Sequence, residues 1–148
     1  MAAQTFLGVR LAFPVVGLLL AIGLGLTGCN EAVQADVVGD WAMTQASHQY
    51  LPPDQQTMSA RLTLRSDGRF AAVDLPGAFH GVVGVADRNS GSGTWKLMMR
   101  DGRQQIQLVF DESYGTQLEV VRSGNAWTLQ YFLGDPDEGR KIELERPT

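Results

Sequence analysis

Met58-Ser59-Ala60-Arg61-Leu62-Thr63-Leu64-Arg65-Ser66-Asp67-Gly68 carries the clearest structural signal in this chain. Apolar and polar residues alternate from Met58 to Arg65, and this period of two predicts a β-strand with one buried face. The Ser-Asp-Gly that follows predicts a tight turn, because Asp and Gly tolerate the positive φ angles that hairpins need. The stretch therefore predicts the first half of an antiparallel hairpin.

The same alternation recurs almost to the end of the chain. The sequence predicts eight strands, at residues 37–44, 58–65, 69–75, 92–99, 104–110, 116–121, 126–133 and 140–146. Turn signals rich in Gly and Asp stand at 66–68, 100–102, 123–125 and 134–139. No helix is expected from residue 29 onward, and the best place for a short helical turn is 53–59.

Eight sequential antiparallel strands leave two exposed edges unless the sheet closes on itself. Closure removes both edges and leaves an interior that side chains or one small ligand can fill. The expected fold class is therefore all-β, an eight-stranded antiparallel up-and-down barrel, with a two-sheet β-sandwich as the alternative. The alternating apolar residues would line the interior, as Trp95, Leu97 and Met99 do on one strand.

The first 28 residues differ sharply from the rest in composition. An uncharged apolar run of 16 residues, Leu11 to Leu26, follows the single cation Arg10 and ends in small residues. This order is typical of a secretory signal peptide. The run is shorter than the roughly 20 residues of a membrane-spanning helix.

The run ends in Leu26-Thr27-Gly28-Cys29, which resembles the lipobox of bacterial lipoproteins. The resemblance implies that a diacylglyceryl group is attached to the Cys29 thiol, that residues 1–28 are then removed, and that the new amino group receives a further chain such as palmitate. Stable anchoring needs two or more such chains. Cys29 is the only cysteine, so lipidation would use the one free thiol of an exported protein. Asn30 stands where lipoproteins retained in the inner membrane often have Asp, which favours an outer-membrane lipoprotein facing the periplasm.

Cleavage would leave 120 residues, divided into a lipidated tether at 29–36 and a β-barrel domain at 37–148. This mature part holds 11 basic and 16 acidic residues, and that balance argues against a nucleic-acid partner. The expected partners are the membrane, through the acyl chains on Cys29, and an apolar small ligand or another envelope protein.

Gly39-Asp40-Trp41 resembles the Gly-x-Trp signature that opens the lipocalin and wider calycin barrels. In those families the fold is an eight-stranded up-and-down barrel, and the Trp closes one end beneath an Arg from just beyond the last strand. The resemblance implies that Arg146, rather than Arg140, covers Trp41. Gly93-Thr94-Trp95 has the same spacing. No helix is expected after the last strand, unlike in lipocalins, so the resemblance does not imply a large ligand cavity.

The residues expected to contact a ligand or partner are apolar or aromatic: Trp41, Trp95, Phe79, Val82 and Tyr131. Trp41 and Trp95 would line a pocket or belong to the core, where inward aromatic rings usually pack. Residues 75–93 combine several glycines with apolar side chains. They would form a lid or contact loop at the barrel mouth, or a loop folded over the barrel end, or a further short strand at 81–86.

No catalytic, cofactor or metal site is expected. His48 and His80 fall in predicted loops without metal-ligand spacing, and no phosphate loop, dinucleotide fingerprint or nucleophile elbow occurs. The acidic loop 135–139 would be a polar turn, with a calcium loop as the alternative.

Three classes of function remain, of which an enzyme is the least expected. The first is a binding or interaction module for an apolar ligand or an envelope component. The second is an inhibitor or protective lipoprotein, although inhibitors that insert a free N-terminal segment conflict with a lipidated N-terminus. An apolar cavity at the mouth would favour ligand carriage, and a packed interior would favour surface recognition.

Overall fold

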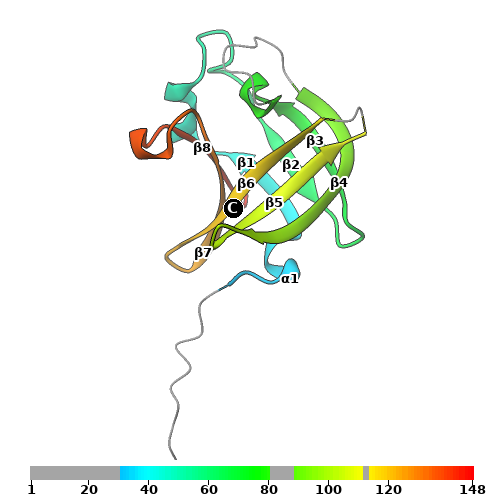
Figure 1. The fold of residues 1–148 in the computed structure, drawn as a ribbon. Coiled ribbons are helices and arrows are strands. Elements are labelled where there is room, and N and C mark those ends of the chain that lie inside the picture. The colour runs from blue at the N-terminus through cyan, green and yellow to red at the C-terminus, as the bar shows by residue number, and fades with distance from the viewer. Residues whose placement is uncertain (1–30, 81–88, 112–113) are drawn as a thin grey trace, which may run out of the picture.

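The computed structural model describes residues 31–80, 89–111 and 114–148, and these form a closed eight-stranded β-barrel (Figure 1). The strands are β1 (Gly39–Met43), β2 (Arg61–Leu64), β3 (Arg69–Leu75), β4 (Asn89–Arg100), β5 (Arg103–Phe110), β6 (Gly115–Ser123), β7 (Ala126–Phe132) and β8 (Lys141–Glu145). Each strand is antiparallel to its neighbours in sequence, and β8 closes the barrel against β1. The predicted up-and-down barrel is confirmed, and the alternative of a β-sandwich is wrong.

Within the described residues, four short helical segments lie before or between the strands, in places where no helix was predicted. They are α1 (Gln34–Val37), η1 (Gln45–Tyr50), η2 (Gly77–His80) and η3 (Pro136–Glu138), the last three being 3₁₀ turns. The helical turn expected at 53–59 is a plain turn at 53–57. The predicted strand at 37–44 begins only at Gly39, because α1 occupies the chain up to Val37.

The other strand boundaries lie close to the prediction, with two exceptions. The strand expected from Met58 begins at Arg61, although Met58 and Ala60 are still buried. The irregular stretch expected up to residue 93 ends earlier, because β4 already begins at Asn89. The further strand considered at 81–86 lies outside the described residues.

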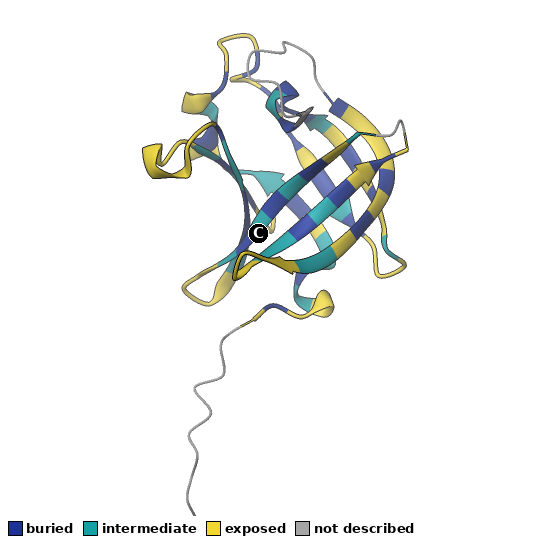
Figure 2. Ribbon diagram, viewed as in Figure 1, coloured by how far each residue is buried: buried dark blue, intermediate teal, exposed yellow. Residues whose placement is uncertain are grey.

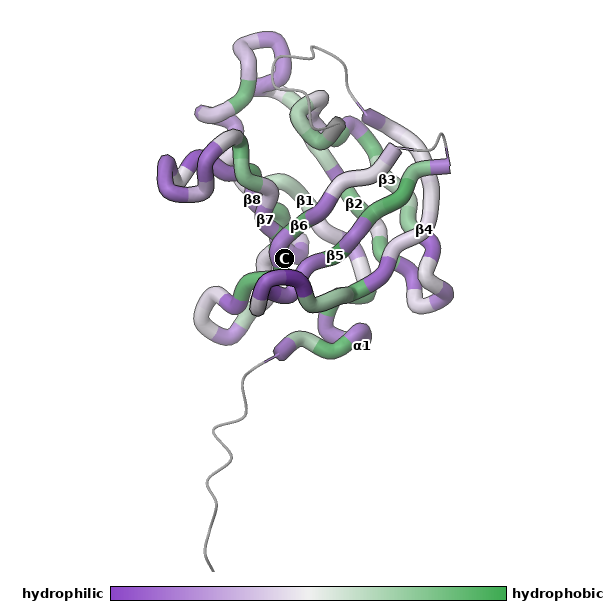
Figure 3. The backbone as a smooth tube through the Cα atoms, viewed as in Figure 1, coloured by the Kyte–Doolittle hydropathy of each residue, from purple (hydrophilic) through white to green (hydrophobic). Residues whose placement is uncertain are grey.

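The core consists of the inward side chains of every strand. Figures 2 and 3 show the matching pattern along the backbone, where buried and hydrophobic positions recur on the strands. Leu62, Leu108 and Leu129 have no exposed area, and the rings of Phe70 and Phe110 meet edge to face with centroids 4.8 Å apart. The prediction that Met99 lines the interior is wrong, since its side chain is 51% exposed. Alternation places Met99 on the inward face, but Met99 lies next to the β4–β5 turn, where the strands extend beyond the packed core.

The barrel has two distinct ends. At one end, called the tether end from here on, lie α1 and the β2–β3, β4–β5 and β6–β7 turns; at the other, called the mouth, lie η1, η2 and η3 (Figure 1). α1 is joined to the β2–β3 turn by the Gln34 side chain, which donates to the carbonyl of Ser66 over 3.3 Å. Candidate functional residues occur at both ends.

Candidate functional site

Trp41 closes the tether end of the barrel. Its ring is 1% exposed, and its indole N–H donates to the carbonyl of Val37 over 2.9 Å. The Arg146 guanidinium carbon lies 4.9 Å from the ring centre, while Nη2 donates to the carbonyls of Asp36 and Val38 at 2.6 and 2.9 Å. The expectation that Arg146 covers Trp41 is confirmed, and Arg140 instead pairs with Glu138 at the mouth.

Gly39 is required by this arrangement for two reasons. Its φ of 134° is a conformation that side chains rarely adopt. A β-carbon there would also stand 2.6 Å from Nη1 of Arg146. Trp95, which follows the second Gly-x-Trp, is held differently: its indole N–H donates to the carbonyl of Arg65 over 2.9 Å.

The chain just before α1 is fixed to the tether end. The amide N–H of Ala32 donates to Oε1 of Gln104 over 2.6 Å, and Nε2 of Gln104 donates back to the Ala32 carbonyl over 2.8 Å. Ala32 is only 4% exposed. Within the segment expected to be a tether up to Asp36, Ala32 is therefore fixed to the barrel, whereas Val33, Gln34 and Ala35 are exposed.

At the mouth, η2 inserts Phe79 between the strands. Its ring is fully buried and stacks on Tyr131, with centroids 4.6 Å apart and planes 17° apart. The Tyr131 hydroxyl donates to the carbonyl of Ala78 over 2.6 Å. Burial raises the pKa of Tyr131 above its usual 10.0, because the charged phenolate would lose solvation there. η2 therefore closes one side of the mouth, where its Phe79 ring packs against Tyr131.

The barrel wall is incomplete between β6 and β7 near the mouth. The two strands pair from Ser123 opposite Ala126 up to Glu119 opposite Gln130, and their pairing ends there. On its other edge, β6 remains paired with β5 down to Gly115. An open hollow of about 340 Å³ occupies this place and is called the seam hollow. It is lined by Gln107, Gly115, Thr116, Gln117 and Tyr131.

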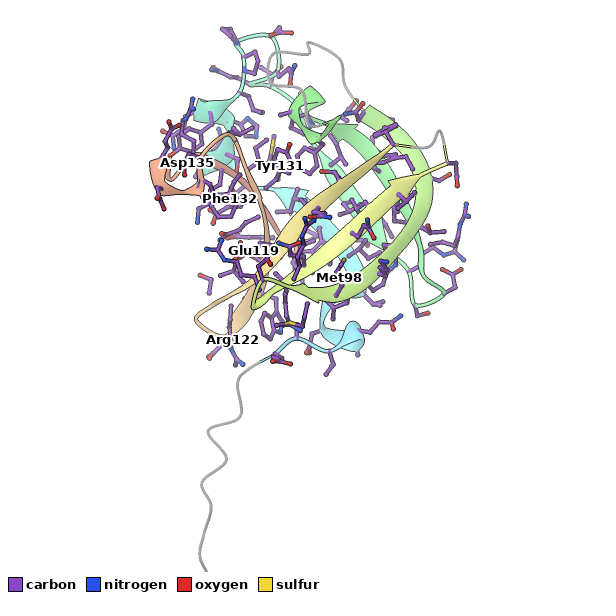
Figure 4. All side chains as sticks on the ribbon, viewed as in Figure 1. Met98, Glu119, Arg122, Tyr131, Phe132 and Asp135 are labelled. Carbon is purple, nitrogen blue, oxygen red and sulfur yellow. The ribbon has the colours of Figure 1, made fainter. Side chains whose placement is uncertain are left out.

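The structure brings together only part of the predicted contact set. Phe79 and Tyr131 lie together at the mouth, whereas Trp41 and Trp95 are buried nearer the tether end. Figure 4 shows Tyr131 in the half of the barrel that faces the mouth. Val82 and Cys29 lie outside the described residues. The glutamines of the seam hollow were not predicted. Their only signal in the sequence is their place at polar positions of alternating strands.

Two structural features are absent from the described ranges 31–80, 89–111 and 114–148. There, no three His, Cys, Asp or Glu side chains gather as a metal site would require. No helix in these ranges has the length and apolar character needed to cross a bilayer. Comparison of the chain with protein-family models, with curated proteins and with solved structures returns no match. A proposal for the function of this protein therefore rests on its own geometry.

Proposed function

We propose that this protein is a bacterial lipoprotein, held in the outer membrane by acyl chains on Cys29 and facing the periplasm, whose barrel binds an extended segment of another envelope protein. The observation that carries the proposal is the seam hollow, where β6 leaves β7 and presents an edge from Gly115 to Leu118. An extended peptide can add to such an edge through main-chain hydrogen bonds.

The packing of the interior supports surface recognition over ligand carriage. A void large enough for water would leave accessible area on the side chains around it. Leu62, Leu108, Leu118 and Ile142 have none, and Trp41 has 1%. Phe79 fills the interior near the mouth in the same way. Around these side chains the interior is filled by the protein itself, which leaves no room there for a carried ligand.

The chemistry of the seam hollow suits a peptide backbone. The amides of Gln107 and Gln117 can donate and accept hydrogen bonds, and Thr116 adds a hydroxyl. Oε1 of Gln117 already accepts a hydrogen bond from Nη1 of Arg100 over 3.1 Å, so the N–H groups of Gln117 would be the ones to bind a peptide carbonyl. Tyr131 offers an aromatic ring beside them, and aromatic rings are frequent in protein interfaces. The described carboxylates near the mouth are Asp54, Asp74, Asp111, Asp135, Asp137 and Glu138. Asp111 pairs with Arg69, Glu138 pairs with Arg140, and the nearby Lys141 pairs with Glu143. The other four carboxylates leave an excess of acid, which favours a partner segment that carries basic residues.

The inhibitor alternative receives less support from the structure. An inhibitor that inserts its N-terminal segment into a protease needs that segment to be free. Here Ala32 is buried and bound at both its N–H and its carbonyl by Gln104. Only the residues before Ala32 would remain to insert, and they would also carry the anchor.

Mass spectrometry of the membrane-extracted protein tests the anchor, because it reports the acyl chains on Cys29 and the first residue of the mature chain. A photo-crosslinking amino acid at Gln117 tests the seam hollow in living cells. We expect a discrete protein adduct from position 117 that is lost when Gln107→Lys is added. Position 61 on β2, whose Arg61 is exposed on the barrel wall, is the matched control. Equal adducts from both positions, or none from 117, would contradict the proposal.

A further inference from the structure

The tether end of the barrel lies close to the proposed anchor at Cys29. Ala32 is fixed to the tether end by Gln104 and is three residues beyond Cys29. Three residues span at most about 11 Å even when fully extended. Lipid on Cys29 would therefore keep the tether end within about 11 Å of the chain's point of attachment, whatever path those residues take.

The tether end has an open hollow beside this point. It measures about 640 Å³ and lies between the chain at Glu31 to Asp36 and the β6–β7 hairpin, with Arg122, Trp127 and Arg146 in its lining. Arg146 already donates to two main-chain carbonyls, and the Asp36 carboxylate already accepts the N–H of Val33 over 2.8 Å. The hollow is called the tether hollow below.

Arg122 is the cation in this hollow that is left to bind an outside anion. Its Nε donates to the carbonyl of Gly124 over 3.2 Å, and its guanidinium carbon lies 5.5 Å from the centre of the Trp127 ring. None of the described carboxylates forms an ion pair with it. Glu31 also lines the hollow, but it is an exposed residue of the connecting chain itself. Figure 4 shows Arg122 at the tip of the β6–β7 hairpin.

Arginine and tryptophan together are suited to a bilayer surface. A guanidinium binds phosphate oxygens through paired N–H groups. A tryptophan ring is favoured at the level of lipid headgroups. The opposite end of the barrel carries the acidic mouth, which an anionic membrane would repel.

We infer that the tether end rests on the membrane, with Arg122 bound to phospholipid phosphate and Trp127 at the headgroup layer, and that the mouth points away from the bilayer. This inference rests on the lipidation of Cys29 in the proposed function. It commits the partner at the tether hollow to bilayer phospholipid and leaves the seam hollow free for a protein.

Fluorescence quenching in vesicles tests this orientation on the lipidated mature chain. The vesicles contain phosphatidylethanolamine, phosphatidylglycerol and a small share of lipid with a quencher on its headgroup. Since Cys29 is the only cysteine and its thiol would be blocked by lipid, S66C and D137C each accept one fluorophore. Ser66 is exposed in the β2–β3 turn of the tether end and lies outside the lining of the tether hollow. The labels would differ in height by about 20–25 Å, because the nine-residue β6 is about 30 Å long and barrel strands tilt by about 35–45° from the barrel axis. We therefore expect several-fold stronger quenching at 66 than at 137.

Two further variants test the role of Arg122. R122Q is expected to weaken quenching at position 66, whereas R61Q, at an exposed arginine on the barrel wall without an ion pair to any described carboxylate, leaves it unchanged. Equal quenching at 66 and 137 would overturn the orientation, and equal effects of R122Q and R61Q would overturn the phosphate contact. Mass spectrometry of the same samples separates these results from a failure of the anchor, which would show as an unacylated Cys29.

Discussion

Gly39→Ala should destabilise the barrel through two separable effects. The first is backbone strain, because Gly39 has a φ of 134°, and such conformations cost a non-glycine residue about 1–3 kcal/mol. The second is steric, because the new β-carbon would lie 2.6 Å from Nη1 of Arg146 and force that side chain away. The reduced freedom of the unfolded chain offsets less than about 1 kcal/mol of these costs.

The steric effect can be estimated from what Arg146 loses when it moves. It gives up a cation–π contact, worth about 0.5–1 kcal/mol at an exposed site. It also gives up hydrogen bonds to two carbonyls, each worth about 1 kcal/mol net and less where water can replace them. We therefore expect Gly39→Ala to lower the free energy of unfolding by about 2–4 kcal/mol, of which about 1–2 kcal/mol depends on Arg146.

A double-mutant cycle in urea separates the two effects. In an Arg146→Ala background the steric effect is absent, so the cost of Gly39→Ala should fall by about 1–2 kcal/mol. Gly124→Ala serves as the control, because Gly124 has a φ of 60° but no atom within 4 Å of an added β-carbon, and its cost should not depend on Arg146. Tryptophan emission and circular dichroism follow the unfolding midpoint. Costs of Gly39→Ala and Arg146→Ala that add within about 0.5 kcal/mol would refute the reasoning.

Three other substitutions test other parts of the fold. Gly93→Ala should cost at least about 3 kcal/mol in urea unfolding, since its β-carbon would lie 2.1 Å from a backbone oxygen of β5, whereas Gly91→Ala, with its nearest contact at 3.4 Å, should cost less than about 1 kcal/mol. The raised pKa of Tyr131 means that the unfolded chain loses this proton first, so stability is unaffected by it below pH 10.0 and falls above that value; Tyr131→Phe should flatten this alkaline loss in urea unfolding measured against pH. Gln104→Ala should speed hydrogen exchange at the Ala32 amide while the amides of the central strands stay protected, and an unchanged exchange rate would contradict the role of this clamp.

The strands could be predicted because their signal is local. Alternation and turn residues lie within a few positions of one another, and the interior demands one apolar face on every strand. Local alternation does not give a residue's height along the barrel, which is why Met99 was placed in the core and is exposed. The 3₁₀ turn η1 was missed for a related reason. It is held by Ser47, whose Oγ accepts the N–H of Glu143 over 2.8 Å, a partner 96 residues away.

A family resemblance predicted one contact between distant parts of the sequence that local patterns could not predict. Gly-x-Trp and Arg146 stand 105 positions apart, yet the calycin pattern implied their contact, because the fold brings the chain just beyond the last strand of the barrel beside the first. No such pattern covered Gln104 and Gln107. Both lie on β5, but Gln104 holds Ala32 at the tether end and Gln107 lines the seam hollow on the outer wall. Their roles depend on where the pairing of β6 with β7 ends and on where the N-terminal segment contacts the tether end.

The two proposals constrain each other through the height of the barrel. If the tether end rests on the bilayer, Gln117 in the seam hollow lies about 15 Å above it, because it is six residues from Ser123 on a strand that tilts by about 35–45° from the barrel axis. A partner segment that stays within the headgroup layer would not reach that height. The seam hollow would therefore select an extended segment that projects into the periplasm. A crosslinked partner that contacts Gln117 only through a membrane-embedded segment would show that either the orientation or the site is wrong.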